Sequence, residues 1–513
     1  METSTSTNRA IDDFLKPLEI DSSRISELST ELALTFSTLS SQSADQFLPT
    51  PISESILRPV AGQDRGRYLA IDIGGTNLRV AFVELSGTYD DAAQVNGDAT
   101  QKRPTAARQL QRHLEHSWPI QEHLKNENSE SLFAWIGSKV VRVVAKGCEA
   151  FSLPPDEALR MGVTFSFPMK QSSLSQATLM AMGKGFAITS NLDLGGHLMK
   201  GYEKHRASGL PPIKIAAISN DAVATLVSFI YQFPAEAHQK AVMGLIVGTG
   251  CNATIPLKLS SLHQDKRPVA ISVSSDQDVA DVKIAVNTEW SINGTAPPLR
   301  KLGFITHWDE ELDKAGEAPG FQPLEYMTAG RYLGELARLI FVDYLTTSEG
   351  LAIDSLPTKL RQRFGLTTTF ISHFFPGSER GQILSQLEAE FPVETFAWTE
   401  PLAHALYRIA KAIEKRAAAI VAASTVGLLQ CAEEIGEIPE LGQGTDVKEL
   451  VVGYTGGCIQ YFQDYLADTQ RFLDTIMQPH KHVRVVLQPC HDGGITGAGI
   501  LVPASLAGRV VEN

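Results

Sequence analysis

The chain has 513 residues, of which 43% are hydrophobic and 20% are charged, a composition typical of a folded protein with more than one domain. Its net charge of −13 argues against non-specific binding to nucleic acid or to an anionic membrane. Its five cysteines are scattered, form no CxxC pair and follow no secretory signal, so we expect free thiols and a cytoplasmic location. The apolar run at 417–429 is too short to span a bilayer, and we expect neither a membrane span nor a nucleic-acid partner.

In chain order, the sequence first predicts a helical lead-in at 11–39 and then a loop at 48–60. The stretch "YLAIDIGGTNLRVAFVEL" (68–85) consists of two apolar, β-branched runs, which predict two strands joined by a glycine turn. Residues 129–151 carry apolar side chains at helical spacing and predict an amphipathic helix. The stretch 213–233 predicts a strand, a polar Asn-Asp corner and a helix.

A second strand–turn–strand unit is predicted at 241–259, and the polar residues 259–283 predict a surface insertion. The Ala-rich stretch 404–431 predicts a long helix, and 449–462 predicts a third strand–turn unit. The tail, 484–510, reads as a strand, a glycine loop and a terminal helix. Because two similar units each carry a glycine turn, we predict a duplicated α/β fold with a cleft between two domains.

The glycine turns are candidates for phosphate binding. No GxxxxGK[ST] sequence occurs and no GxGxxG opens a helix after a strand, so P-loop and Rossmann nucleotide sites are not predicted. The turns 74–77 and 248–250 can instead form anion nests from successive backbone N–H groups, and their glycines permit positive φ angles. Asp72, at the lip of the first turn, could hold Mg²⁺ through water. A plain β-turn remains the alternative for both stretches.

Three carboxylates have two interpretations each. Asp221, between a predicted strand and a predicted helix, is either a helix N-cap or a general base that accepts a proton from an attacking hydroxyl. Glu289 and Glu325 are either ligands for sugar hydroxyls or solvated surface acids. The residues alone leave these alternatives open.

Seven stretches occur in the order in which the hexokinase family has them: "LAIDIGGTNLRV", "VTFSFPMKQ", "GKGF", "SNDAVATL", "VGTGCNA", "NTEW" and "LEYMTAGRYLGELAR". The sequence therefore resembles that family from about Leu48 to the C-terminus. The resemblance implies the actin-like ATPase fold of sugar kinases, with two domains that close on a sugar and on ATP with Mg²⁺. We also expect a monomer or a homodimer. The implied division is a helical lead-in packed on the large domain (1–65), a small domain (66–219), a large domain (220–488) and a C-terminal loop and helix that return to the small domain (489–513).

The resemblance also implies roles for individual residues. Asp221 matches the general base toward the sugar 6-hydroxyl, Lys184 matches the lysine near the transferring phosphoryl group, and Arg79 follows the first phosphate turn; these three are the implied catalytic residues. The implied sugar-binding residues are Ser166, Phe167, Gly183, Lys184, Asn220, Asp221, Asn252, Glu289 and Glu325. The implied nucleotide-binding residues are Asp72, Gly74, Gly75, Thr76, Asn77, Arg79, Gly248, Thr249, Gly250, Gly330, Arg331, Gly456 and Gly457, with Asp72 also close to magnesium through water.

The sequence departs from the glucose-type hexokinase pattern at four places. Gly183 stands where that pattern has Thr, and "EWSING", with Ser291, replaces "EWGAFG". The turn 454–457 lacks the acid and the hydroxyl of the usual DGS/T, and the loop 492–499 is also altered. The sequence resembles the fungal N-acetylglucosamine kinase branch of the family in the stretches "SWPI", "SLFAWIGSKV", "KGF", "GFQP" with "LEYMTAGRYL", "KRAAAIVA" and the "VGY" turn. That branch also departs from the glucose-type pattern at the Thr and at the DGS/T turn, so we expect an ATP-dependent kinase acting on the 6-hydroxyl of N-acetylglucosamine. The alternatives are a glucose or mannose hexokinase and a non-catalytic sugar sensor.

Overall fold

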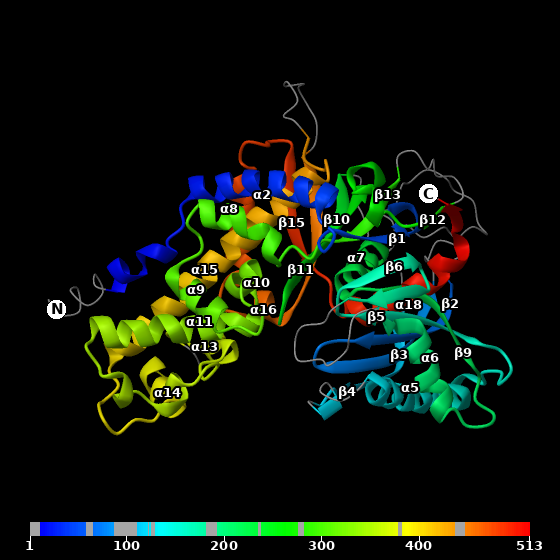
Figure 1. Cartoon of the computed structure of the whole chain (residues 1–513), viewed down its shortest axis with the longest axis horizontal. Helices are drawn as coiled ribbons and strands as arrows, with labels where there is room; N and C mark the ends of the chain where they lie inside the picture. The colour runs from blue at the N-terminus through cyan, green and yellow to red at the C-terminus, as the bar shows by residue number, and fades with distance from the viewer. Residues whose placement is uncertain are drawn as a thin grey trace, which may run out of the picture.

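The computed structural model describes residues 11–57, 65–86, 110–121, 123–124, 129–180, 192–233, 238–274, 282–377, 382–436 and 447–512. Two large sheets dominate it, each covered by helices, as the predicted α/β class requires. In Figure 1 the helices around α11 and α14 lie to the left, and the five-stranded sheet with α5 and α6 lies to the right. None of the described helices is long and apolar enough to cross a membrane.

The smaller sheet has the order β4-β3-β2-β5-β9. Its strands are β2 (Arg65–Ile73), β3 (Asn77–Ser86), β4 (Leu110–Pro119), β5 (Leu159–Phe165) and β9 (Ile213–Ser219). The central strand β3 of this hairpin region is antiparallel to both of its neighbours, β2 and β4, while β5 and β9 continue the sheet in parallel from β2. The predicted hairpin at 68–85 is confirmed, with Asp72 opposite Arg79 in the ladder.

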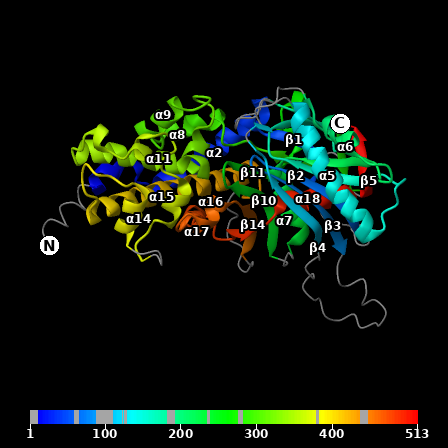
Figure 2. The same cartoon turned by 90° about the horizontal axis from the view of Figure 1, so that it is seen from below.

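The two faces of this sheet carry side chains of different size. Leu69 and Ile71 pack in one core with α5 (Ser129–Phe151) and α6 (Leu194–His205), whereas the alternating residue Ala70 packs on the other face with α18 (Gly493–Ala507). Gly162 allows α18 to approach closely, because a Cβ there would lie 1.9 Å from the Ala498 carbonyl oxygen. On its other side α18 packs against α7 (Asp221–Gln232), and Figure 2 shows these two helices next to each other.

The larger sheet has the order β15-β14-β10-β11-β13-β1-β12-β16. Its strands are β1 (Leu48–Ser53), β10 (Gln239–Val247), β11 (Cys251–Lys258), β12 (Ala270–Val273), β13 (Lys283–Asn287), β14 (Lys448–Thr455), β15 (Val483–Pro489) and β16 (Arg509–Glu512). The second predicted hairpin is thus β10–β11, which is antiparallel.

Two stretches that were expected to lie outside the sheet belong to it. The predicted loop at 48–60 contains β1, which is buried along its whole length, and the predicted insertion at 259–283 contains β12, which pairs with β1 and β16. Pro49 and Pro51 lie within β1, and its ladder to β13 accommodates them with a register shift between Pro49 and Ser53.

The long helix α15 (Glu400–Cys431) is confirmed and is buried along most of its length. The helix α2 (Ser22–Gln42) packs against it, at a point where a Cβ on Gly427 would lie 2.8 Å from the Ser29 carbonyl oxygen. The lead-in at 11–39 is not one continuous helix, because Asp21 caps a new helix by accepting a hydrogen bond from the Arg24 N–H.

The remaining helices are α3 (Glu54–Leu57), α8 (Ala296–Lys301), α9 (His307–Lys314), α10 (Pro323–Thr328), α11 (Gly330–Asp343), α12 (Thr358–Arg361), α13 (Thr368–His373), α14 (Ile383–Glu390), α16 (Gly457–Tyr461) and α17 (Tyr465–Met477). A third sheet contains β6 (Met169–Ser173), β7 (Gln176–Leu179) and β8 (Leu192–Asp193). The division into domains at 1–65, 66–219, 220–488 and 489–513 stays a prediction. Within the last of these segments, α18 packs on the smaller sheet and β16 pairs with β12 of the larger sheet.

Candidate active site

Two neighbouring cavities contain most of the predicted site residues. The larger, of about 840 Å³, is lined by carboxylates and carboxamides that include Asn252, Glu289 and Glu325. The smaller, of about 420 Å³, is lined by the first glycine turn, by Asp72 and Arg79, and by the start of α18. Four residues line both cavities: Thr76, Ser166, Asp221 and Ile246. These shared residues mark the place where the two cavities meet.

Asp221 is not the cap of its helix. The N-cap of α7 is Asn220, whose side-chain oxygen accepts a hydrogen bond of 2.8 Å from the Ala222 N–H. Asp221 is the first residue of the helix; one of its carboxylate oxygens also accepts from Ala222, at 2.8 Å. The capping interpretation of Asp221 is therefore wrong, and its carboxylate lies at the junction of the two cavities.

In the larger cavity, a hydrogen-bonded series of side chains positions two of the predicted sugar ligands. The Asn252 side-chain amide donates to Asn287 at 2.8 Å, and the Asn287 amide donates to a Glu289 carboxylate oxygen at 2.8 Å. Asn287 is buried and was not predicted as a site residue, although it opens the "NTEW" stretch. It fixes the orientation of Asn252 and Glu289 relative to each other.

The backbone of Glu289 is held from a distant part of the chain. Its φ of 46° lies in the left-handed region, which is unfavourable for a residue with a side chain. The buried Gln46 donates to the Glu289 carbonyl oxygen at 2.9 Å and accepts from the Gly294 N–H at 3.0 Å. Gln46 thus ties together both ends of the loop that presents Glu289 and Ser291 to the cavity. No motif in the sequence identified it.

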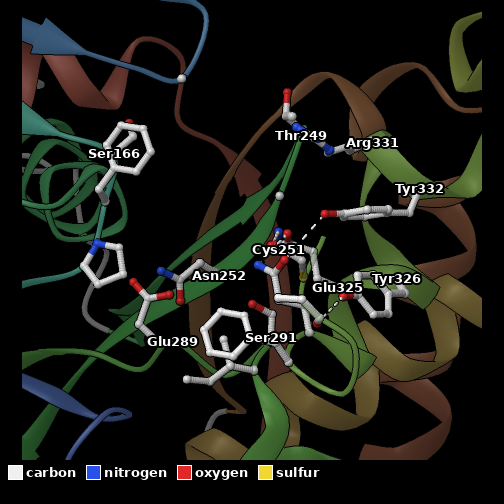
Figure 3. Close-up of a pocket in the computed structure, with 18 of the residues that line it drawn as sticks. Ser166, Thr249, Cys251, Asn252, Glu289, Ser291, Glu325, Tyr326, Arg331 and Tyr332 are labelled. Atoms are coloured by element: carbon white, nitrogen blue, oxygen red, sulfur yellow. Dashed lines mark hydrogen bonds between the residues drawn. The ribbon is translucent and has the colours of Figure 1, made fainter. Parts of the chain in front are cut away.

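Glu325 is buried, so the interpretation as a solvated surface acid is wrong for this residue. One carboxylate oxygen accepts from the Cys251 N–H at 3.1 Å, and the other accepts from the Gln322 side chain at 3.0 Å. Figure 3 shows Glu325 beside Tyr326, across the cavity from Ser166. The arrangement gives the cavity fixed hydrogen-bond acceptors, which suit a ligand with several hydroxyl groups.

Ser166 and Phe167 connect the sugar side of the site to the first glycine turn. The Ser166 N–H donates to the Ile73 carbonyl oxygen at 3.0 Å, immediately before that turn. Phe167 is buried, lines the larger cavity and packs on Phe165 with ring centroids 5.1 Å apart. Gly183 and Lys184 lie outside the described residues.

The first glycine turn joins β2 to β3 and faces the cavities. The Gly74 N–H donates to the Asn77 carbonyl oxygen at 2.9 Å, while Gly74, Thr76 and Asn77 line the smaller cavity. Neither glycine adopts the positive φ that we considered. Gly75 instead leaves the backbone open, because no atom lies within 4 Å of the place where a Cβ would stand.

Asp72 belongs to a cluster of charges beside this turn. It pairs with Arg79 at 2.8 Å, and Arg79 also pairs with Asp492 at 2.7 Å. Burial raises the pKa of Asp72 to about 6, Arg79 opposes this rise, and the nearby Asp221 adds to it. Burial also disfavours the charge of Asp492, but Arg112 and Arg79 hold its pKa below the usual value. At neutral pH both carboxylates therefore carry negative charge.

The residues around Asp72 fit a magnesium ion that keeps most of its water. Mg²⁺ is usually bound through one or two carboxylates and the phosphates of a substrate, rather than by an all-protein cage. Asp72, Asp221 and Thr76 all line the smaller cavity, where such an arrangement has room. Within the described part of the chain, no cluster of three or more His, Cys, Asp or Glu forms a complete metal site.

Three glycine-containing segments converge at the second predicted phosphate turn. The Gly248 N–H donates to the Gly250 carbonyl oxygen at 2.9 Å, and the Gly330 N–H donates to the Gly248 carbonyl oxygen at 2.8 Å. Gly456 has a φ of 121°, and a Cβ there would lie 2.3 Å from the Val247 carbonyl oxygen. Gly457 follows at the start of α16. Thr249 and Arg331 line the larger cavity, in contact through a backbone hydrogen bond of 3.2 Å.

Comparison with known proteins identifies the family. Two family models, each described as Hexokinase, match residues 242–504 and 10–231. The chain belongs to the hexokinase family. Hexokinase-1 of Nicotiana tabacum is 28% identical over 451 residues, covering 86% of this chain and 80% of the relative. Hexokinase-1 of Arabidopsis thaliana is likewise 28% identical, over 86% of this chain and 80% of the relative.

The fold of this hexokinase agrees with solved members of the family. The structure of Schistosoma mansoni hexokinase, which was complexed with glucose, superposes with a TM-score of 0.74 at 24% identity, covering 97% of this chain and 99% of that chain. A second hexokinase crystal structure gives a TM-score of 0.71 at 21% identity, over 98% and 99% of the two chains. The prediction of a duplicated, two-domain actin-like fold is confirmed, and the protein is an ATP-dependent sugar kinase that phosphorylates hexoses.

Proposed function

We propose that this hexokinase transfers the γ-phosphoryl group of ATP to the 6-hydroxyl of N-acetylglucosamine, with Asp221 as the general base. The observation that carries the proposal is the shared wall of the two cavities, to which Asp221 and Ser166 both contribute. A sugar among Asn252, Glu289 and Glu325 can place a hydroxyl at this wall. A phosphoryl group held by the first glycine turn can reach the same wall from the other cavity.

The chemistry follows from this placement. Asp221 accepts the proton of the 6-hydroxyl, the sugar oxygen forms a bond to the γ-phosphorus, and the bond from that phosphorus to the bridging oxygen breaks, so that ADP leaves. Asp221 then loses its proton to solvent. Asn252 and Glu289 bind sugar hydroxyls in this proposal, and the Thr76 region binds phosphate. We propose Lys184 and Arg79 as the cations near the transferring group.

Magnesium has a limited part in the proposal. When bound, it neutralises charge on the β- and γ-phosphate oxygens. Asp72 is the residue that we propose to hold it through water, because its carboxylate is ionised at neutral pH and faces the smaller cavity. The nucleotide itself is proposed to extend toward Thr249, Gly330 and the turn at 456–457.

Two observations favour N-acetylglucosamine over an unsubstituted hexose. Ser291, which stands in one of the stretches that depart from the glucose-type pattern, is buried and lines the larger cavity. The cavity also continues past Glu325 to Tyr326 and Tyr332, which leaves room beyond the hydroxyl-binding residues. Glucose is the second candidate, because the curated relatives are hexokinases and a solved neighbour was complexed with glucose.

The decisive experiment is a coupled assay of ADP release with N-acetylglucosamine, glucose and mannose, with phosphorus NMR of the product to locate the phosphate. We expect the highest kcat/KM for N-acetylglucosamine and a 6-phosphate product. A higher value for glucose would establish the second candidate. Absence of sugar-dependent ADP release with all three sugars would favour the non-catalytic sensor. A cytoplasmic location and a monomeric or homodimeric state also remain predictions; the five free cysteines support a reducing compartment.

A further inference from the structure

One side of the larger cavity, away from Asp221, is lined mainly by aromatic side chains. Beyond Glu325 its lining includes Ala318, Phe321, Gln322, Tyr326 and Tyr332, which we call the aromatic annex. None of these residues lines the smaller, phosphate-side cavity. Figure 3 shows Tyr326 and Tyr332 on the side of the cavity opposite Ser166, which does line both cavities. The annex therefore lies apart from the residues that the larger cavity shares with the phosphate-side cavity.

The annex is preformed by contacts among its own residues. The rings of Tyr326 and Tyr332 meet edge to face, with centroids 4.8 Å apart and an interplanar angle of 74°. The Tyr326 hydroxyl donates to the Ala318 carbonyl oxygen at 3.3 Å, and the Tyr332 hydroxyl donates to the Gln322 side-chain oxygen at 3.4 Å. Phe321 is 43% exposed, so the annex opens toward solvent at this residue.

The ring geometry of a hexopyranose determines which carbon of the sugar lies nearest the annex when the 6-hydroxyl meets Asp221. Carbon 6 is attached to carbon 5, and carbon 2 lies directly across the six-membered ring from carbon 5. A sugar whose 6-hydroxyl meets Asp221 therefore directs its carbon 2 substituent toward the opposite end of the cavity.

The composition of the annex suits an acylamino group better than a hydroxyl. Aromatic ring faces and edges bind alkyl groups through burial of apolar area, and the Gln322 side chain offers a partner for an amide. We propose that the aromatic annex binds the N-acyl group at carbon 2, and that the enzyme accepts 2-acylamino-2-deoxyhexoses with acyl chains longer than acetyl. This inference rests on the proposed function and adds to it a location for the acyl group and a substrate class.

The test is a kinetic series with glucose, N-acetyl-, N-propionyl- and N-butanoylglucosamine. In the native enzyme we expect the three acylated sugars to have kcat/KM values within about tenfold of one another, because each added methylene still finds apolar surface. Ala318→Trp narrows the annex at an exposed loop residue. It should lower kcat/KM for the N-butanoyl sugar at least tenfold more than for glucose. Ala352→Trp, at another exposed loop alanine that lines neither cavity, is the matched control.

The possible outcomes distinguish a failure of the proposed function from a failure of the annex assignment. If the native enzyme phosphorylates glucose but not N-acetylglucosamine, the proposed function itself is wrong. If N-acetylglucosamine is a good substrate and Ala318→Trp lowers kcat/KM equally for all four sugars, only the annex assignment is wrong. A loss of more than a hundredfold between the N-acetyl and N-propionyl sugars would likewise overturn it, since it would place the acyl group in a closed space. Phe321→Ala widens the annex and should raise the ratio of N-butanoyl to N-acetyl activity.

Discussion

Gln46 should control the affinity for sugar although it lies outside every recognised motif. Gln46→Leu keeps the approximate size of the side chain but removes its amide. The Glu289 carbonyl oxygen and the Gly294 N–H would then lose their partners at 2.9 and 3.0 Å. A buried polar group without a partner costs about 1–3 kcal/mol. The left-handed φ of Glu289 adds a strain of about 1–3 kcal/mol that its surroundings must hold.

The loop can relieve these costs by moving Glu289 out of its binding position. If about 2 kcal/mol of the total is lost from sugar binding, the KM for sugar rises about 30-fold. The KM for ATP should change less than threefold, because Gln46 does not line the smaller cavity. The assay is steady-state ADP release with each substrate varied in turn, together with thermal unfolding of the variant.

Gln470 offers a matched control. Its side chain donates to the Val485 carbonyl oxygen at 2.9 Å and accepts from the Leu487 N–H at 3.0 Å, which is the same pair of bonds that Gln46 makes. It lines neither cavity. Gln470→Leu should therefore lower the melting temperature without raising the KM for sugar. If Gln46→Leu is folded and retains the native KM for sugar, or if both variants raise that KM alike, the positioning role of Gln46 is refuted.

Three further predictions concern the reacting groups. Asp221→Ala should lower kcat by about 10²–10⁴-fold or more while sugar binding, measured by calorimetry, is largely retained; near-native turnover at saturating sugar would rule out the base assignment. Gly183→Thr should raise the ratio of kcat/KM for glucose to kcat/KM for N-acetylglucosamine by about 10–200-fold, which corresponds to about 1–3 kcal/mol. An unchanged ratio would show that Gly183 does not determine specificity. Because the pKa of Asp72 is about 6, kcat/KM for ATP should fall as the pH is lowered from 7.5 to 5. Arg79→Gln removes a cation that opposes this raised pKa, so the midpoint should move to higher pH, and an unchanged midpoint would contradict the role of Asp72.

Local pattern was sufficient for the elements that carry the site. The alternation of apolar residues at 68–85 predicted the hairpin β2–β3, and the strand–Asn–Asp–helix order predicted β9 and α7. Local pattern failed at β1 and β12, because neither strand has a strong signal of its own and both depend on neighbours far away in the chain. The proline-containing β1 is recognisable as a strand only once β13 is placed beside it.

The roles of single side chains were predictable where chemistry and order along the chain coincided. Glu325 was a correct candidate for the cavity, but its burial follows from bonds to Cys251 and Gln322 that the residue type alone does not reveal. Asn287 could have been identified, since it is a carboxamide in the same "NTEW" stretch as the predicted ligand Glu289. Gln46 had no such signal, because its partners lie more than 240 residues away.

Asp72, just before the first glycine turn, has one interaction that the sequence predicts and others that it does not. The register of a hairpin with a short turn places Asp72 opposite Arg79, so this ion pair follows from the sequence alone. The sequence does not predict that Asp492, from the start of α18, binds the other side of the same guanidinium, or that Arg112 binds Asp492 in turn. These distant charges matter for function, because burial favours the neutral form of Asp72 and only its cationic neighbour keeps the pKa near 6 rather than higher. The Asp72 carboxylate is ionised at neutral pH. Arg79 is shared between Asp72 and Asp492, and Arg112 is shared between Asp492 and Glu115, so three carboxylates face two guanidinium groups. The residual negative charge at the smaller cavity is what a hydrated Mg²⁺ would require of it.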